Sequence, residues 1–202
     1  DRHQSAFATG FRVWELDRGA LAGGQLAVLR CAGVLPDGTT FHCPEGDPLP
    51  PPRSIGEHFG AQRDAVTVHL ALPTPPSGGR VYADRDASDA TVPLERRRQR
   101  LVDLARPESA REVETARLRL SLRFDDEPLA GFCTLPIARL VRGTGTGFAL
   151  AEAFVPPATT VTAAPLLTSL LRQVAGMLTQ KVTELSGQRR GGGGIAEAAG
   201  IL

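Results

Sequence analysis

The residue types that bind metal ions gather in one short stretch, where His42 and Cys43 are followed closely by Glu45 and Asp47. Imidazole, thiolate and carboxylate groups are the usual protein ligands of zinc and iron. Adjacent residues on a strand point to opposite faces, so His42 and Cys43 could share one ion only if the strand ended between them. We therefore predict no metal site and no cofactor for this chain.

Paired carboxylates, the side chains of general acid–base catalysis, occur as Asp125, Asp126 and Glu127. They follow a strand-like segment. The sequence predicts no apolar surroundings that would raise the pKa of one carboxyl group above that of another. The glycine-rich run at residues 143–147 (GTGTG) lacks the Lys-Ser/Thr and the following helix of a phosphate loop, and there is no G-x-S-x-G. The polar residues otherwise lie in turns and on alternating strand positions, so we predict that the chain is not an enzyme.

The three cysteines, Cys31, Cys43 and Cys133, are odd in number and form no C-x-x-C pair. Reduced thiols and a cytoplasmic location are therefore expected. No apolar run approaches the length of a membrane span, and the first ten residues (DRHQSAFATG) have no apolar signal-peptide core. We expect no direct insertion into a membrane.

The overall charge is balanced, with 23 basic and 22 acidic residues and a formal net charge of +1. This balance predicts no nucleic-acid groove. One exception is local, because Arg96, Arg97, Arg98 and Arg100 fall within five residues. Such a run is typical of a solvated strand edge that discourages aggregation, and a site for an anionic partner is the alternative.

Most of the chain is typical of short antiparallel strands. Between turns rich in Gly and Pro, apolar residues either alternate with polar ones or follow one another directly. The segments with this pattern are residues 9–16, 25–34, 65–72, 113–124, 129–141 and 148–154. Residues 91–103 fit a strand or one helical turn, and we favour the strand. Pro36, Asp37 and Gly38 predict a tight hairpin turn, whereas residues 48–52 (PLPPP) predict an extended connector or, alternatively, an SH3-type ligand. About eight to ten strands without βαβ alternation predict an antiparallel β-sandwich or jelly roll.

A single long helix is predicted over about residues 164–186, with Pro165 in its first turn. Its apolar residues recur at steps of 4, 3, 4 and 7 and form a seam: Leu167, Leu171, Val174, Leu178 and Leu185. We expect this seam to be an oligomer interface; packing against the β module of the same chain is the alternative. A glycine-rich loop is expected at residues 187–194, followed by the start of a further helix. The predicted domains are thus residues 1–160 and 161–202.

Several of these segments occur together in one known family. They are, in order, GFRVWELD, GVLPDGTTF, LPPPR, VTVHLALP, LSLRF, LPIARL and FVPPATTVTAAPLLTSLL. Their order and spacing over residues 9–186 resemble the N-terminal part of the TssK family, baseplate proteins of bacterial type VI secretion. The most specific pieces are residues 33–41 and the pairing of residues 135–139 with residues 154–157.

The resemblance implies a shoulder domain of jelly-roll type, similar to that of siphophage receptor-binding proteins, followed by a helical neck. It implies a homotrimer whose shoulder docks on a wedge of TssF and TssG. A C-terminal head, which we expect this chain to lack, would link to the membrane complex TssJ–TssL–TssM, placing the protein in the cytoplasm at the inner-membrane-associated baseplate. The alternative function is a phage tail receptor-binding or adaptor protein with a similar shoulder and stalk.

Overall fold

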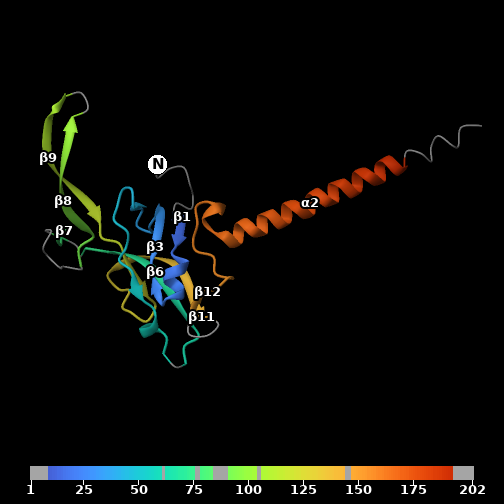
Figure 1. Cartoon of the computed structure of the whole chain (residues 1–202), viewed down its shortest axis with the longest axis horizontal. Coiled ribbons are helices and arrows are strands. Elements are labelled where there is room, and N and C mark those ends of the chain that lie inside the picture. Colours follow the sequence, from blue (N-terminus) through green and yellow to red (C-terminus); the bar gives the residue numbers. More distant parts are fainter. Residues whose placement is uncertain are drawn as a thin grey trace, which may run out of the picture. The chain divides into compact units, whose positions relative to one another are not determined.

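The computed structural model describes residues 9–60, 62–75, 78–83, 91–103, 106–143 and 147–192. The chain divides into two compact units, Asp1–Ala164 and Pro165–Leu202. The first is mainly antiparallel β-structure, and the second contains one long helix (Figure 1). The prediction of a mainly β fold followed by a helix is confirmed.

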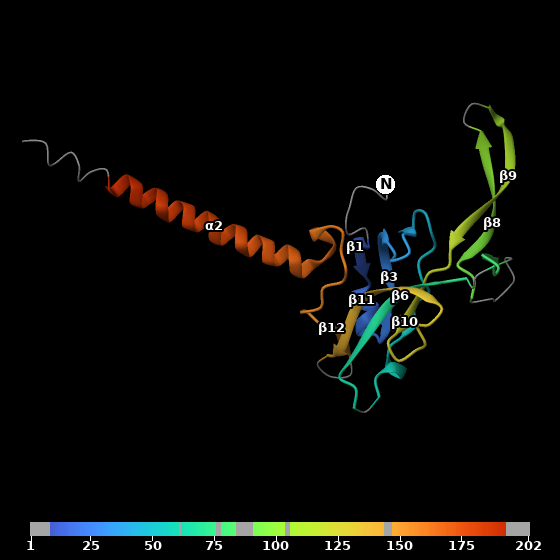
Figure 2. The same ribbon diagram turned by 180° about the vertical axis from the view of Figure 1, so that it is seen from behind.

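Two antiparallel sheets build the centre of the first unit (Figures 1 and 2). One has the order β1-β3-β4, from Gly10–Leu16, Val28–Val34 and Thr40–Cys43. The other has the order β10-β6-β11-β12, from Ser121–Phe124, Ala65–Pro73, Phe132–Arg142 and Phe148–Leu150. A two-stranded pair, β2 (Gln25–Leu26) and β5 (Arg53–Ser54), lies beside them. The remaining short elements are α1 (Arg18–Ala22), η1 (Gly56–His58) and η2 (Val161–Ala163).

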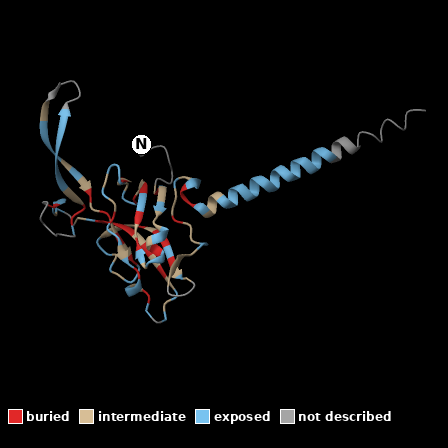
Figure 3. Cartoon of the chain, viewed as in Figure 1, coloured by how far each residue is buried: buried red, intermediate tan, exposed pale blue. Residues whose placement is uncertain are grey.

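The core of the sandwich consists of apolar side chains from both sheets, and Figure 3 shows the buried residues concentrated there. Alternation along β6 places Val66, Val68, Leu70 and Leu72 in this core, as the period of two predicted. Fully buried members from other strands are Phe11, Leu122, Phe124, Leu135, Ile137 and Leu140.

The hairpin between β3 and β4 has the turn that its sequence predicts. The amide of Thr39 donates to Asp37 Oδ1 at 2.8 Å, and Gly38 adopts φ of 83°. In a Pro-Asp-Gly turn, the Asp side chain accepts a backbone amide of its own turn, and the glycine adopts the positive φ that other residues disfavour. The register that follows pairs Gly33 with Phe41 and Cys31 with Cys43.

A strap of residues 157–160 closes the far edge of β1. The amide of Phe11 donates to the Pro157 carbonyl at 2.8 Å, and the amide of Thr159 donates to the Phe11 carbonyl at 2.9 Å. Gly10 makes this approach possible, because it adopts φ of 140° and a Cβ there would lie 2.8 Å from the Pro157 carbonyl. The final residues of the first unit are thus hydrogen-bonded to its first strand.

Three strands form a separate sheet that projects from the sandwich (Figures 1 and 2). They are β7 (Tyr82–Ala83), β8 (Leu94–Asp103) and β9 (Arg106–Leu118), in the order β7-β8-β9. We call the β8–β9 hairpin the arm. Its base is held where Asp47 Oδ1 accepts from the Leu118 amide at 3.1 Å and the Arg119 amide donates to the Pro93 carbonyl at 2.9 Å.

Several boundaries differ from those predicted. The single strand expected at residues 113–124 is two strands, because the chain passes from the arm to the sandwich at Arg119 and Leu120. Ala116, which the alternation of residues 113–124 would place on the inward side with Leu118, is exposed on the arm for the same reason. Residues 25–34 also divide, into β2 and β3. The short helix α1 was not predicted, although Asp17 caps it by accepting from the Ala20 amide at 3.0 Å.

The long helix α2 spans Pro165–Gly192. Proline suits a first helical position, and Ala164 before it is extended, with φ of −119° and ψ of 106°. The helix continues through residues 187–192, so the loop predicted there is wrong for those residues. Glycine lowers helix stability without forbidding helix. The further helix expected at residues 195–202 lies outside the described residues.

Candidate interaction surfaces

The His42 stretch is a turn stabilised by its own backbone. The His42 carbonyl accepts from the amides of Gly46 at 2.6 Å and Asp47 at 2.9 Å, and Asp47 Oδ2 accepts from the His42 amide at 3.3 Å. Cys43 is buried while His42 stays half-exposed, so the two side chains lie on opposite faces as expected. Among the residues that the structure describes, no three His, Cys, Asp or Glu side chains are grouped to hold a metal ion.

Cys31 and Cys43 face each other across β3 and β4 with both thiols fully buried. A hydrogen bond with Cys43, together with burial, raises the pKa of the Cys31 thiol far above its ordinary value. Cys133 on β11 is only partly buried, and burial raises the pKa of its thiol too. All three cysteines are free.

A thiol reagent should therefore distinguish these cysteines. We expect dithionitrobenzoate at pH 8 to modify Cys133 first in the folded protein, and Cys31 and Cys43 only after unfolding, because a buried protonated thiol is neither accessible nor nucleophilic. Cys133→Ser should abolish the native-state reaction and leave two thiols titrating in denaturant. Labelling of Cys31 or Cys43 without unfolding would contradict this assignment.

The carboxylates at 125–127 form a network of ion pairs instead of an acid–base pair. Arg63 reaches Asp125 at 2.7 Å, His58 Nδ1 lies 2.9 Å from Asp126, and Arg53 reaches Glu127 at 2.8 Å. The His58 ring also stacks on Phe124 at 3.7 Å between centroids. Each carboxylate has a cationic or imidazole partner. These contacts connect the turn after β10 to the segment that precedes β6.

These partners change the carboxylate pKa values. Burial alone would raise the pKa of Asp126 and Glu127, but hydrogen bonds from His58 and Arg53 and nearby positive charge more than offset it, so both pKa values lie below their ordinary values of 3.8 and 4.5. A carboxylate whose pKa is lower in the folded state stabilises the fold above its unfolded pKa. That contribution is lost as pH falls through the folded pKa.

Urea unfolding should show this linkage as a loss of stability when the pH is lowered from 6 to 3. We expect Arg53→Met to flatten the loss, because Glu127 then titrates closer to its unfolded value. Arg100→Met removes an exposed arginine of the arm and is the matched control that should keep the wild-type profile. The assignment fails if Arg53→Met and wild type lose stability in parallel over this pH range.

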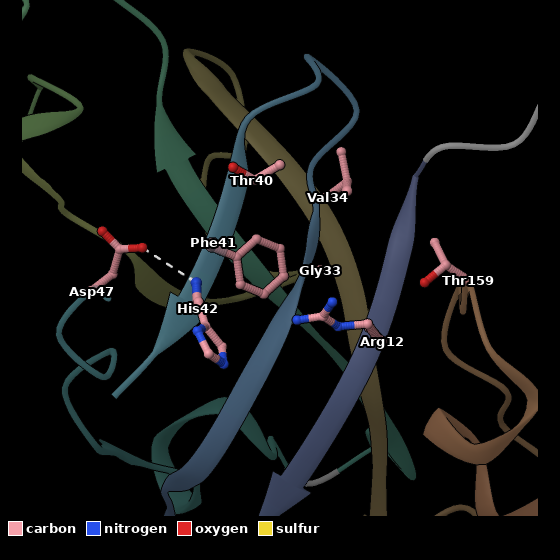
Figure 4. Close-up of a pocket in the computed structure, with 8 residues that line it drawn as sticks. All are labelled: Arg12, Gly33, Val34, Thr40, Phe41, His42, Asp47 and Thr159. Atoms are coloured by element: carbon pink, nitrogen blue, oxygen red, sulfur yellow. Dashed lines mark hydrogen bonds between the residues drawn. The ribbon is translucent and has the colours of Figure 1, made fainter. Parts of the chain in front are cut away.

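A shallow pocket of about 330 Å³ lies on the sheet β1-β3-β4 (Figure 4). Its lining residues are Arg12, Gly33, Val34, Thr40, Phe41, His42, Asp47 and Thr159. Arg12 extends from β1 toward β3, and both oxygens of Asp47 already accept backbone amides. The Thr159 hydroxyl likewise donates to the Phe11 carbonyl at 3.3 Å. No sequence pattern had marked Arg12 or Thr159.

The seam predicted on α2 is largely exposed. Leu171 is 59%, Leu178 62% and Leu185 51% exposed, Val174 is also exposed, and Leu167 is intermediate. Further apolar side chains on the same side, Leu170, Met177 and Val182, are exposed as well. Burying a Leu-sized side chain contributes about 1.5–3 kcal/mol, and in this helix that apolar area is exposed as one continuous stripe. None of the described helices is long and apolar enough to cross a membrane.

The chain matches one protein family over nearly its whole length. Residues 2–201 match the model of the family described as Bacterial Type VI secretion, VC_A0110, EvfL, ImpJ, VasE. The chain belongs to this family. The match includes every described strand and α2, and it favours the secretion protein over the phage tail adaptor that the sequence left as an alternative.

Individual relatives agree with the family match. The chain is 30% identical over 197 residues to the type VI secretion system baseplate component TssK1 of Pseudomonas aeruginosa, which covers 96% of this chain and 44% of the relative. It superposes with a TM-score of 0.82 and 27% identity on a chain of the TssK–TssF–TssG baseplate subcomplex, covering 94% of this chain and 62% of that one. A crystal structure of TssK, at 24% identity and a TM-score of 0.79, shares the fold, with 93% and 42% coverage.

The chain spans less than half the length of the curated TssK1 and about three fifths of the chain in the subcomplex. The resemblance that the sequence predicted, to the TssK family, is confirmed together with its fold.

Proposed function

We propose that this chain acts as a non-catalytic structural subunit of a type VI secretion baseplate, with its β-sandwich as the shoulder that docks on a TssF–TssG wedge. The observation that carries the proposal is the similarity, over 94% of this chain, to a chain in the TssK–TssF–TssG subcomplex. A second solved structure, the baseplate complex of the type VI secretion system, matches 92% of this chain at 26% identity and a TM-score of 0.77.

The proposal also assigns a role to α2. Its seam, Leu167, Leu171, Val174, Leu178 and Leu185, packs in this view against the same seam of two further copies and forms the neck of a homotrimer. A closed symmetric assembly would cover all three stripes at once. Repeated shoulders would then engage a wedge through several weak contacts, which raises avidity without any new contact type.

The remaining part of the proposal concerns the whole protein. The link to the membrane complex TssJ–TssL–TssM would lie in a head domain, in the portion of TssK relatives that this chain does not span. The assembly would work in the cytoplasm, beside the inner membrane and without inserting into it. No described residue supports a catalytic role.

Wedge docking is tested by affinity capture. The tagged chain is co-expressed with TssF and TssG from the same gene cluster, and co-purification of both in stoichiometric amounts is expected. Leu120→Asp, which disrupts the sandwich, serves as the control that should lose both partners. If the folded wild-type chain retains neither TssF nor TssG, the proposal is wrong.

A further inference from the structure

The pocket on the sheet β1-β3-β4 contains an arginine whose guanidinium group is unpaired. Along β1, Phe11 pairs with Gly33, and the next paired residue, Val13, pairs with Ala32. Arg12 between them is the extra residue of a β-bulge, which turns a side chain out of the regular alternation. Its side chain is exposed, lines the pocket and extends toward β3 (Figure 4). Among the residues that the structure describes, its guanidinium group has no hydrogen-bond or ion-pair partner.

The carboxylates around the pocket are engaged elsewhere. Among the lining residues only Asp47 is acidic, and its two oxygens accept the amides of His42 and Leu118 at 3.3 and 3.1 Å. Glu45, outside the lining, reaches Arg30 at 3.0 Å and lies 3.5 Å from His42 Nε2. A carboxylate of another molecule that entered the pocket would therefore meet a guanidinium group without a competing partner.

The rest of the lining suits a short polar ligand with an aliphatic part. Thr40 on β4 is exposed, and its hydroxyl has no partner within the described part of the chain. Val34 is half-buried on β3, the strand between β1 and β4. The volume of about 330 Å³ is at the lower end for ligand pockets, which measure about 300–1,000 Å³. The pocket thus offers a cation, a hydroxyl and a small aliphatic surface.

An edge strand borders the pocket. β4 is last in the order β1-β3-β4, so no described strand pairs with its outer side. The Leu35 amide donates to the Thr39 carbonyl at 2.9 Å, which fixes the alternation of the β3–β4 hairpin. In an antiparallel pair this alternation directs the N–H and C=O groups of the next residue, Thr40, away from β3. An extended chain beside β4 could therefore pair with Thr40 while one of its side chains enters the pocket.

We propose that the pocket binds the carboxylate of an Asp or Glu side chain on an extended segment of another protein, with Arg12 as its anchor. The planar fork of a guanidinium group donates two parallel hydrogen bonds to a carboxylate, and the single charge of each group matches the other. The Thr40 hydroxyl donates to the same carboxylate, and Val34 contacts its methylene groups. Pairing with the edge of β4 holds the backbone of the segment.

A phosphate group fits these residues less well. It carries a charge of about −1.5 to −2 at pH 7, which one guanidinium group does not balance. The carboxylate of Asp47 in the lining would add repulsion. Proteins that bind nucleic acids present several cations to the phosphate backbone, whereas Arg12 is the only Arg or Lys of this lining. The chemistry of the pocket therefore favours a protein carboxylate.

A peptide pair tests the preference for a carboxylate. Binding of N-acetyl-Val-Glu-Val-amide to the folded protein at pH 7 is measured by saturation-transfer NMR, which detects weak ligands of large proteins. We expect a millimolar dissociation constant, and binding of N-acetyl-Val-Gln-Val-amide should be at least tenfold weaker because a charged hydrogen-bonded pair is lost. Equal binding of the two peptides, or no binding of the Glu peptide, would overturn the proposal.

Variants locate the peptide on the protein. Arg12→Gln should weaken binding of the Glu peptide at least tenfold, and Arg12→Lys should give an intermediate loss because it keeps the charge without the fork. Arg139→Gln is the matched control, since Arg139 is an exposed arginine on β11 of the other sheet, and should change binding less than twofold. Equal losses from Arg12→Gln and Arg139→Gln would show a general charge effect and refute the site.

Competition distinguishes a carboxylate site from a phosphate site. Acetate and inorganic phosphate are added at equal millimolar concentration and equal ionic strength to the complex with the Glu peptide. We expect acetate to displace the peptide at least as well as phosphate does. Stronger displacement by phosphate would replace the protein carboxylate by a phosphate ligand. Because the probe is a peptide, each of these results is independent of whether the protein retains TssF and TssG.

Discussion

Replacing Leu171 and Leu178 together with aspartate is expected to convert the proposed trimer into a monomer while the β-sandwich stays folded. Both side chains are exposed in a single copy of the chain, so the substitutions remove no contact within that copy's sandwich. In a threefold seam they would instead bring six carboxylates together around one axis. Burying one unpaired carboxylate costs about several kcal/mol. Six of them would outweigh the stabilisation that the remaining leucines of the seam provide.

Light scattering coupled to size-exclusion chromatography measures the molar mass of the wild-type protein and the variant at micromolar concentration. Circular dichroism reports their β content. Gln173→Asp with Gln180→Asp provides the control, because these residues have the same spacing of seven on the opposite side of α2. That pair should leave the mass unchanged. A monomeric wild type, or a trimeric Leu171/Leu178 variant, would mean that the seam has another partner.

The second large effect is expected at Leu120, which is 4% exposed and packs in the core of the sandwich. Leu120→Asp places a carboxylate there without a partner. Loss of buried apolar contacts and the cost of an unpaired charge together predict destabilisation of about 4 kcal/mol or more. The variant should unfold at much lower urea concentration or fail to fold at 25 °C.

Leu101→Asp is the matched control, because the same replacement is made at a leucine that is 44% exposed on the arm. Its expected cost is within about 0.5 kcal/mol. Denaturation followed by tryptophan fluorescence is suitable, since Trp14 packs against Phe11 with 5.1 Å between ring centroids. Similar midpoints for the two variants would show that Leu120 is not part of the core.

The fold was predictable where local chemistry and burial agree. Strict alternation along β6 and the Pro-Asp-Gly turn each identify their structure from a few neighbouring residues. The arm was not predictable in this way. Residues 113–118 share the alternation of the core residues 120–124, and only the tertiary contact between Arg119 and Pro93 shows where the chain leaves the sandwich.

The same distinction applies to the surfaces. A heptad-like spacing identified the seam of α2 as an apolar stripe, although its occupant stays a proposal. On the arm, the register of β8 against β9 decides which arginines share a face with Glu112 and Glu114. A sequence read along one strand shows a cluster of arginines, but it does not show which of them are neutralised from the other strand.

The strap at residues 157–160 has a consequence for the order in which the chain folds during synthesis. Thr159 hydroxyl and Phe11 carbonyl are hydrogen-bonded across 148 residues, so the free edge of β1 stays open until nearly all of the sandwich has left the ribosome. Contacts between such distant residues are slow to form because a long loop must close first. Since α2 begins only at Pro165, its apolar seam is synthesised after every strand of the sandwich. A nascent chain therefore contains every strand of its β-sandwich before the apolar stripe of α2 has been made.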